Sequence, residues 1–539
     1  MAVTPNTNIR LLKCNLNLDE FNQLNFASKN AQYNYFNGLQ KLDISGATYQ
    51  RHNNVIRYAA HIDTILEYNY VMYQNNNYSD KWFYAYITRM EYVNDNMTNI
   101  YIKTDPYQTW QFDLTFMRSF VEREHVDNDT VGLHTLDEEL SLGDFLQVSA
   151  PSDINTLSSS DVAVCVSVTE LPSGVSLGDS KQHTINGIYS GLINCIFSHS
   201  EGLSKIAEEV NYFISKYDSA AKANAISSIY MIPKSFFLAT GSMDLIVYES
   251  GHSFYLPTNI NTYCNITNDV TIAAPNTLAE SYSPHNNKLK CFPYSYLLVS
   301  NNAGGDVVFH YEDFTNNTPK FKVIGALTPG CSIKCIPLNY LKQTDNNTYK
   351  SFNYGIVGAK LPICPWVNDT YTNWLSENGV PIAVKVGLGL AQVAVGVATG
   401  GIGLAVGAVS GAATVAGAIT DNYTASKAPD QANGDVAAGD ITFSAGKSVF
   451  TAYKMSIRSE RAKVIDSYFD MYGYKVNTLK VPNVTGRANW NYVKTINANI
   501  EGYIPQEDLD EIKRMFDNGV TIWHNPSTFL DYSQNNGII

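Results

Sequence analysis

The sequence is poor in charged residues. Asp, Glu, Lys and Arg make up 16% of its 539 residues, against roughly 25% in a typical soluble domain. A disordered chain is excluded nevertheless, because disorder combines high charge with few aromatic residues, and this chain has 36 Tyr and 23 Phe. A long coiled coil is excluded too, since it would need a bias toward Ala, Glu, Lys, Leu and Arg. Hydrophobic residues make up 45%, which is enough for a large globular core.

The chain also lacks an excess of basic residues. Lys and Arg number 37 against 50 Asp and Glu, so that the net charge is −13. This balance argues against tight binding of nucleic acid over a broad basic surface, where Lys and Arg must replace counterions. Contact with DNA that slides past is not excluded, because an acidic conduit would not hold its cargo.

Close cysteine pairs are almost missing. The eight cysteines are scattered along the chain, and only Cys331 and Cys335 lie near each other. Their three-residue gap is not the spacing of a zinc or redox site, and no second pair follows. We expect isolated, reduced thiols in strands. The N-terminus has neither the basic nor the apolar region of a secretory signal, so we expect synthesis in a cytoplasm.

Catalytic motifs are missing as well. Ser444-Ala-Gly-Lys447-Ser448 resembles the end of a phosphate-binding loop, but Ile441 stands where the first glycine belongs. The sequence contains no zinc-protease helix motif, no nucleophile elbow and no EF-hand loop. We therefore expect no enzyme activity, no catalytic residue, no cofactor and no metal.

One cluster of acidic residues leaves two interpretations open. Glu122 and Glu124 around Arg123 predict an exposed or paired strand face rather than an acid/base dyad. Further along, His125 and His134 flank or adjoin a group of acids that could form a metal site or a solvated acidic face or loop. These acids are Asp127, Asp129, Asp137, Glu138 and Glu139.

Short aromatic and β-branched runs indicate that strands dominate the fold. Asn94-Asp95-Asn96 lies between two such runs, 85–92 and 98–103, and predicts a hairpin. The other predicted strands are 9–16, 55–60, 81–87, 161–170, 243–249, 292–300, 305–311, 320–326 and 331–336.

Few segments have helical periodicity. Residues 204–214 place Ile206, Val210, Phe213 and Ile214 on one face, and the helix could continue through Asp218–Ile229. A second helix is expected at 459–469. A third is expected at 506–517, where Pro505 opens the helix, acids fill its first turn and Gly519 follows its end. Together these patterns predict a β-rich α+β, multidomain protein.

An apolar run from Pro381 to Ile419 departs from the rest of the chain. It consists mainly of Gly, Ala and Val, lacks aromatic residues, and has Lys385 as its only charge. Gly400-Gly401 divides it into two arms, each long enough for a helix of roughly 28 Å. The composition is poor for a buried helix pair, because glycine costs ~1 kcal/mol per helical position relative to alanine.

Two membrane interpretations of this run are also open. An ordinary transmembrane hairpin fits its length, but the run is weakly hydrophobic and only Trp374 and Tyr423 lie near its ends. A segment that enters a membrane only when triggered fits better, because repeated Gly-xxx-Gly spacings let helices approach closely in lipid. The residues expected to act there are Pro381, Ile382, Val384, Lys385, Leu388, Leu390, Val393, Gly396, Gly400, Gly401, Gly403, Leu404, Gly407, Val409, Gly411 and Ile419.

Three parts of the chain together resemble a known family. The first is Ser119–His125 following Thr104–Trp110, the second is the apolar run, and the third begins at Ile465–Asn477. The third continues through Val481-Pro482-Asn483, Arg487, Trp490-Asn491-Tyr492 and Ile504-Pro505, and closes with Gly519–His524. In these segments the chain resembles the tail-knob, or distal tail tube, proteins of the small short-tailed phages of Gram-positive bacteria, the Picovirinae type.

The resemblance implies a virion protein of the phage tail, made in the host cytoplasm as a late protein. It implies a homo-hexameric ring built on a tail-tube-like β domain, which meets other tail proteins: the lower collar or tail tube and a tail-tip lysin. Apolar loops would plug the ring until infection. They would then leave it, insert into the host cytoplasmic membrane and form a pore, through which viral DNA passes without specific binding during genome ejection.

The resemblance also suggests a division of the chain. We expect residues 1–130 and 446–539 to form the two parts of the tube domain, 131–375 to form inserted β-rich domains, and 376–445 to form the apolar membrane-active loop with its flexible linker. A receptor-binding protein and a cell-wall-degrading tail protein are the alternatives. The first would leave the apolar run unexplained, and the second lacks a recognisable site.

Overall fold

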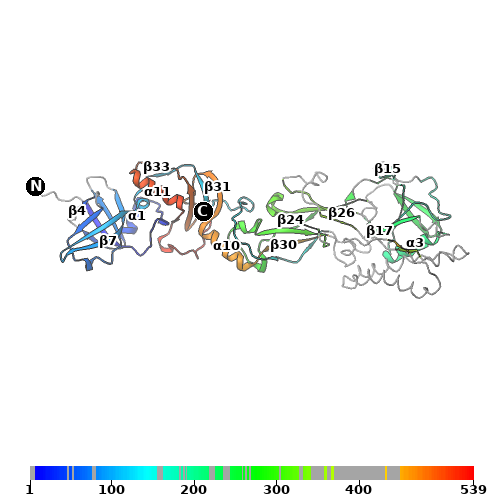
Figure 1. Ribbon diagram of the computed structural model, residues 1–539, viewed down its shortest axis with the longest axis horizontal. Helices are drawn as coiled ribbons and strands as arrows, with labels where there is room; N and C mark the ends of the chain where they lie inside the picture. Colours follow the sequence, from blue (N-terminus) through cyan, green and yellow to red (C-terminus); the bar gives the residue numbers. More distant parts are fainter. Residues whose placement is uncertain are drawn as a thin grey trace. The chain divides into compact units, whose positions relative to one another are not determined.

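Unit 1 of the computed structural model is assembled from three stretches of chain, 1–142, 284–289 and 460–539, and unit 2 from the stretches between them, 143–283 and 290–459. Figure 1 draws strands of unit 1 in blue and its C-terminal helices α10 and α11 in orange to red. The structure describes residues 7–44, 48–50, 54–75, 81–154, 162–180, 184–185, 188–189, 191–217, 225–234, 243–257, 259–260, 264–265, 269–302, 305–326, 332–341, 357–360, 366–368, 431–433 and 450–539.

Unit 1 contains a seven-stranded antiparallel sheet in the order β3-β1-β6-β7-β8-β5-β4. Its longest pair, β7 and β8, forms the hairpin predicted from Asn94-Asp95-Asn96, and Asn94 pairs with Met97 across the turn. The strands are β1 (Thr7–Lys13), β3 (Gln40–Ile44), β4 (Thr48–Gln50), β5 (Val55–Tyr58), β6 (Tyr70–Asn75), β7 (Trp82–Asn94) and β8 (Met97–Thr104).

Both faces of this sheet are covered at its centre. Adjacent residues of a strand point to opposite faces, and accordingly Leu11 and Leu12 belong to two different hydrophobic clusters. The cluster around Leu12 includes Phe36 of helix α1 (Lys29–Asn37). Ser28 begins this helix by accepting a hydrogen bond from the Ala31 backbone N–H at 3.1 Å, a capping signal that the periodicity of the sequence did not reveal.

A five-stranded sheet joins the two ends of the chain; we call it the crossover sheet. Its order is β2-β34-β32-β10-β31, so the N-terminal strand β10 lies between two C-terminal strands. Strands β9 and β33 pair with each other and extend the β10–β32 ladder. The bounds are β2 (Asn22–Leu24), β9 (Leu114–Phe116), β10 (Ser119–Glu124), β31 (Tyr474–Lys480), β32 (Trp490–Ile496), β33 (Ile500–Gly502) and β34 (Val520–Trp523).

Besides α1, the described part of unit 1 contains the helices α2, α10 and α11. Helix α11 (Gln506–Asn518) confirms the third predicted helix, with Pro505 and Gly519 at its ends. It buries Leu509, Ile512, Met515 and Phe516, the spacing of one helical face. Helix α10 (Ser459–Tyr472) confirms the second. The short helix α2 (Pro106–Trp110), capped by Asp105, was not predicted.

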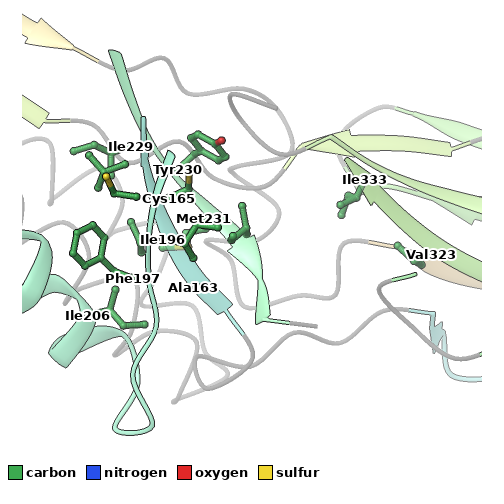
Figure 2. Packing of buried hydrophobic residues seen from close by; sticks show 14 of the residues in the cluster. Ala163, Cys165, Ile196, Phe197, Ile206, Ile229, Tyr230, Met231, Val323 and Ile333 are labelled. Carbon is green, nitrogen blue, oxygen red and sulfur yellow. The ribbon is translucent and has the colours of Figure 1, made fainter. Parts of the chain in front are cut away.

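Unit 2 has its largest core around the sheet β17-β13-β16-β19-β18. Helix α3 (Leu203–Ser215) buries the four residues predicted for its apolar face, each at most 1% exposed. Figure 2 shows Ile206 of this helix close to Phe197 of β16. The strands are β13 (Val162–Val168), β16 (Ile193–Phe197), β17 (Ile226–Pro233), β18 (Met243–Glu249) and β19 (His252–Pro257).

The expected continuation of this helix through Asp218–Ile229 is wrong where the structure describes it. Helix α3 ends at Ser215, and Ile226 to Ile229 lie in strand β17, which pairs with β13. Two isoleucines and a following Tyr-Met-Ile favour a buried strand once a neighbouring strand is available. This partner is distant in sequence and therefore gave no local signal.

Most of the remaining described strands of unit 2 form three further sheets. One has the order β11-β30-β23-β24, with β12 also paired to β30: β11 (Phe145–Gln147), β12 (Ser152–Asp153), β23 (Ser295–Ser300), β24 (Asp306–Phe309) and β30 (Thr451–Ile457). A second contains β21 (Cys264–Asn265), β22 (Val270–Thr271), β25 (Lys320–Ala326), β26 (Ser332–Pro337) and β27 (Val357–Lys360). A third contains β14 (Thr184–Ile185), β15 (Ile188–Tyr189) and β20 (Asn259–Ile260).

The described cysteines fit the expectation of isolated thiols. Cys14, Cys165, Cys195, Cys291 and Cys335 are buried and form no disulfide; Cys165, Cys195 and Cys335 lie in strands as expected, whereas Cys14 and Cys291 do not. Burial raises the pKa of the Cys165 thiol to about 12, so this thiol stays protonated and unreactive near neutral pH.

Gly473, between α10 and β31, generates the first prediction. Its φ is +62°, and a Cβ added there would lie 2.1 Å from the Glu124 carbonyl oxygen. We expect Gly473→Ala to lower the free energy of unfolding by roughly 3 kcal/mol or more, because strain from the positive φ adds to a backbone clash.

Gly174→Ala is the matched control, because φ is +80° there and nothing lies within 4 Å of the added Cβ. It should lose only about 1 kcal/mol in the same urea-unfolding measurement. Equal losses for the two variants would contradict the clash.

Candidate functional site at the chain crossover

The predicted membrane-active residues, from Pro381 to Ile419, lie outside the described residues. The structure does describe two strands on either side of them, β28 (Trp366–Asn368) and β29 (Gln431–Asn433). These strands pair antiparallel, with Trp366 opposite Asn433. The segment that contains the apolar run therefore starts and ends at one two-stranded ladder. Among the described residues, no helix is both long and apolar enough to cross a membrane.

The other segments of the family resemblance meet in unit 1. Ser119–Glu124 is strand β10, and its neighbours β31 and β32 come from the C-terminal segments. Phe120, for example, lies opposite Leu479 on one side and Ile496 on the other. The crossover sheet thus brings together the first and third parts of the chain that carry the resemblance.

A buried carboxylate joins all three stretches of unit 1. The Glu138 side chain is fully buried and forms ion pairs with Arg123 and Lys288. It also accepts a hydrogen bond from the Lys475 backbone N–H at 2.9 Å. Lys288 is itself 3% exposed and lies over the Tyr474 ring at 5.3 Å. Because each buried ion would cost several kcal/mol alone, these charges hold one another in place.

Asp466 of helix α10 secures the short middle stretch, 284–289. Its carboxylate accepts hydrogen bonds from the backbone N–H groups of His285 at 2.7 Å and Asn286 at 3.1 Å. The Asn286 side chain donates to Asp466 as well, at 2.8 Å. One carboxylate thus satisfies backbone groups that would otherwise be buried without a partner.

His125 is buried in a neutral form. The Tyr492 backbone N–H donates to Nδ1 at 2.7 Å, so the ring proton is on Nε2 and is donated to the Asp470 carbonyl oxygen at 3.0 Å. Burial, with a further contribution from the Arg487 charge, lowers the pKa of His125 to about 3. Both ring nitrogens are occupied, and therefore His125 cannot be the metal ligand that one interpretation of this region proposed.

The second interpretation, a solvated acidic face or loop at 127–139, is only partly correct. Asp127, Asp137 and Glu139 are exposed, as that interpretation requires, whereas Glu138 is buried. No group of three or more His, Cys, Asp or Glu side chains among the described residues could hold a metal ion. The burial of Glu138 could not be predicted from sequence, because its partner Lys288 is far away along the chain.

The acids of β10 are paired, as predicted. Glu122 forms an ion pair with Lys494 at 2.9 Å, and Glu124 forms one with Lys480 at 2.5 Å. The sequence does contain a signal for the burial of Asp466. This residue falls on the same face of α10 as Ala462, Ile465 and Phe469, which are all buried. An acid within an apolar helical face indicates a buried partner.

A cavity of about 1120 Å³ opens elsewhere in unit 1, between α1, β7 and the segment before α11. Its lining contains a single carboxylate, Asp113, which is paired with Lys81 and Lys29. The Lys81 ammonium also lies 3.4 Å from the centre of the Trp110 ring. Hydrolysis of a glycosidic bond ordinarily uses two carboxyl groups, so this lining does not fit a wall-degrading glycosidase.

Two family models match different parts of the chain. The family model of the C-terminal domain of tail knob protein gp9 from Bacillus phage phi29 matches residues 259–537. A model of the N-terminus of the caudoviral major tail protein matches residues 5–115, which include the seven-stranded sheet.

Full-length relatives match as well. Tail knob protein gp9 of Bacillus phage PZA is 25% identical over 97% of this chain and 98% of its own length, and that of Bacillus phage phi29 has the same identity and coverage. The solved structure of the bacteriophage C1 tail knob protein, gp12, has a TM-score of 0.64 at 14% identity and covers 99% of this chain and all of its own. This last likeness shows a shared fold.

Glu138 generates a prediction for the site. Glu138→Gln should lower the free energy of unfolding by about 3–5 kcal/mol, because it leaves Lys288 buried without a carboxylate. Glu139→Gln is the control: Glu139 is the adjacent residue, its side chain is 78% exposed and it pairs with Lys475. The control should change stability by less than ~1 kcal/mol.

Urea unfolding gives the size of both effects, and hydrogen exchange at 284–289 locates them. Adding Lys288→Met to Glu138→Gln should recover part of the loss, because it removes the unpaired charge. A Glu138→Gln variant as stable as Glu139→Gln would contradict the role given to the buried carboxylate.

His125 generates a pH prediction. As pH falls from 6.5, the ordinary value for histidine, toward about 3, the unfolded chain binds a proton at His125 and the folded chain does not. Stability is therefore present above pH 6.5 and falls by up to ~1.4 kcal/mol per pH unit below it. His524, whose pKa burial lowers to about 4, adds to the loss.

The variant His125→Gln keeps an acceptor and a donor but does not titrate, so unfolding measured between pH 7 and pH 4 should depend less steeply on pH. Identical slopes for His125→Gln and the parent protein would show that His125 is not kept neutral.

Proposed function

The chain belongs to the tail knob protein gp9 family of phi29-like Bacillus phages and is a virion structural protein of the phage tail, and from this premise we propose that it forms the distal tail tube as a ring of identical chains. Six copies are proposed from the family resemblance. The ring adjoins other tail proteins, namely the lower collar or tail tube and a tail-tip lysin. The match of residues 5–115 to the N-terminus of a major tail protein supports a tube-forming role for the seven-stranded sheet.

The apolar run, Pro381–Ile419, is the observation that carries the second half of the proposal. In a chain with few charges and many aromatic residues, this run has one charge, Lys385, and no aromatic residue. A single chain in water would gain from covering such a surface. In a ring, the copies of residues 376–445 cover one another in the lumen and plug it.

On infection, the loops leave the lumen and enter the host cytoplasmic membrane, where they form the pore for genome ejection. Transfer into lipid is favourable by ~25 cal/mol for each Å² of apolar surface still in contact with water in the plugged state. The pairing of β28 with β29 supports the release of a loop as one piece, because both ends of the segment are held at the same ladder.

The charge of the chain supports passage of DNA rather than binding. With a net charge of −13, the chain has little capacity to displace counterions from phosphates. Lys385 lies near one end of the apolar run, and we assign it to the level of the lipid headgroups, where its long side chain can reach water.

The experiment compares the full chain with a variant in which residues 381–419 are replaced by a Gly/Ser segment of equal length. Both should form rings by negative-stain microscopy. Only the parent protein should release dye from anionic liposomes when stepwise warming opens the plug. Lys385→Glu should reduce the release, because it repels anionic headgroups.

Rings that never release dye would contradict the proposed pore but not the proposed tube. Release that persists after replacement of 381–419 would assign the membrane activity to another part of the chain. A Lys385→Glu variant as active as the parent would contradict the placement of Lys385.

A further inference from the structure

The exposed face of the crossover sheet has three large apolar side chains in one row. Leu479, Phe120 and Ile496 are 57%, 39% and 48% exposed, and they are direct cross-strand neighbours on β31, β10 and β32. Cross-strand partners share a face of the sheet. We call these three residues the apolar row. On the opposite face, Val121 and Thr495 are at most 1% exposed, so the row is on the outside of the unit.

The surroundings of the apolar row enlarge it and give it a positive charge. Met117 and Val481, close in sequence, are also exposed, at 38% and 49%. Arg118 is exposed and donates a hydrogen bond to the Leu479 carbonyl oxygen at 3.3 Å. No carboxylate among the described residues forms an ion pair with Arg118. Glu122 and Lys494 neutralise each other next to the row, which leaves the Arg118 charge uncompensated.

A second exposed surface of unit 1 has the complementary chemistry. Tyr503, between β33 and α11, is fully exposed at 102%. Glu501, Glu507 and Asp510 near it are exposed, and none of them forms an ion pair with a described cation. The nearby Lys29 and Lys81 are paired with Asp113. We call Tyr503 and these three acids the acidic tip.

The apolar row and the acidic tip are two different sets of exposed residues on the same unit. The β32–β33 ribbon leads from Ile496 to Tyr503, and β33 is held by its pairing with β9, where Gly502 lies opposite Leu114. The chain between them spans no more than roughly 25 Å. A contact between two different surfaces of identical chains is head-to-tail, and it continues from copy to copy until a ring closes.

We propose that the acidic tip of one copy of this chain docks on the apolar row of the next copy, with Tyr503 on Leu479, Phe120 and Ile496, and with the acids of the tip facing Arg118. Charge complementarity and exposed aromatic and aliphatic groups on both sides select a second copy as the occupant. This inference rests on the proposed ring and names the surfaces that build it.

The test uses variants of the full chain that each gain one cysteine on the surface. Tyr503→Cys and Leu479→Cys, mixed and oxidised mildly, should form a disulfide-linked dimer that neither variant forms alone at a comparable yield. Tyr92→Cys mixed with Leu479→Cys is the matched control, since Tyr92 is 48% exposed on the β7–β8 hairpin. The parent protein gives the background, which should be low because Cys14, Cys165, Cys195, Cys291 and Cys335 are buried.

A charge reversal tests the same contact without cysteine. Arg118→Glu should raise the protein concentration at half-assembly roughly tenfold, because it places like charges together. Light scattering after gel filtration measures the assembly. Arg57→Glu, at an exposed residue of β5 in the seven-stranded sheet, is the control and should leave assembly unchanged.

Each negative result contradicts a different part of the proposal. An oligomeric parent protein whose Tyr503–Leu479 cross-linking does not exceed the Tyr92 control overturns this contact and leaves the ring. A parent protein that is monomeric at every concentration overturns the ring itself. Efficient cross-linking of either single variant to itself overturns the head-to-tail arrangement. If Arg118→Glu assembles normally but is not incorporated into tails, the apolar row docks another tail protein.

Discussion

Unit 1 depends on the buried carboxylate of Glu138. Its partners come from all three stretches of the chain that build the unit: Arg123 from the first, Lys288 from the second and the Lys475 backbone from the third. Since a buried ion without partners would cost several kcal/mol, the site is favourable only when all three stretches are in place. The same requirement applies to β10, which lies between two strands that follow it by more than 300 residues.

The long insertions between the parts of unit 1 have only a small free-energy cost. The entropy cost of closing a loop rises only with the logarithm of its length, so inserting unit 2 adds little beyond the cost of a much shorter connection. The insertion does require specific contacts that hold residues 284–289, the short stretch of unit 1 between the two parts of unit 2. Asp466 provides them by accepting hydrogen bonds from the backbone of this stretch.

Local elements were predictable from the sequence where the pattern was strong. The four buried residues of α3, the ends of α11 and the β7–β8 hairpin follow from periodicity and turn chemistry alone. The extension of α3 was predicted incorrectly and helix α1 was missed because burial against strands distant in sequence determines the structure at both places. Glu138 could not be assigned from sequence for the same reason. Its acidic neighbours suggested solvent or a metal, and the basic partner that determines its state is Lys288, about 150 positions along the chain.

The two units would divide the tasks that the proposed mechanism requires. A ring has to persist while its plug leaves, so the contacts that hold the ring should be independent of those that hold the plug. The apolar row and the acidic tip both belong to unit 1, whereas the ladder of β28 and β29 at the base of the apolar segment belongs to unit 2. In the proposed mechanism, the loops can then exchange a protein environment for lipid without breaking the unit 1 contacts between copies. Because the buried joint at Glu138 and Asp466 lies within unit 1, it also fixes the chain where unit 2 begins and ends, and so a rearrangement in unit 2 need not disturb the tube.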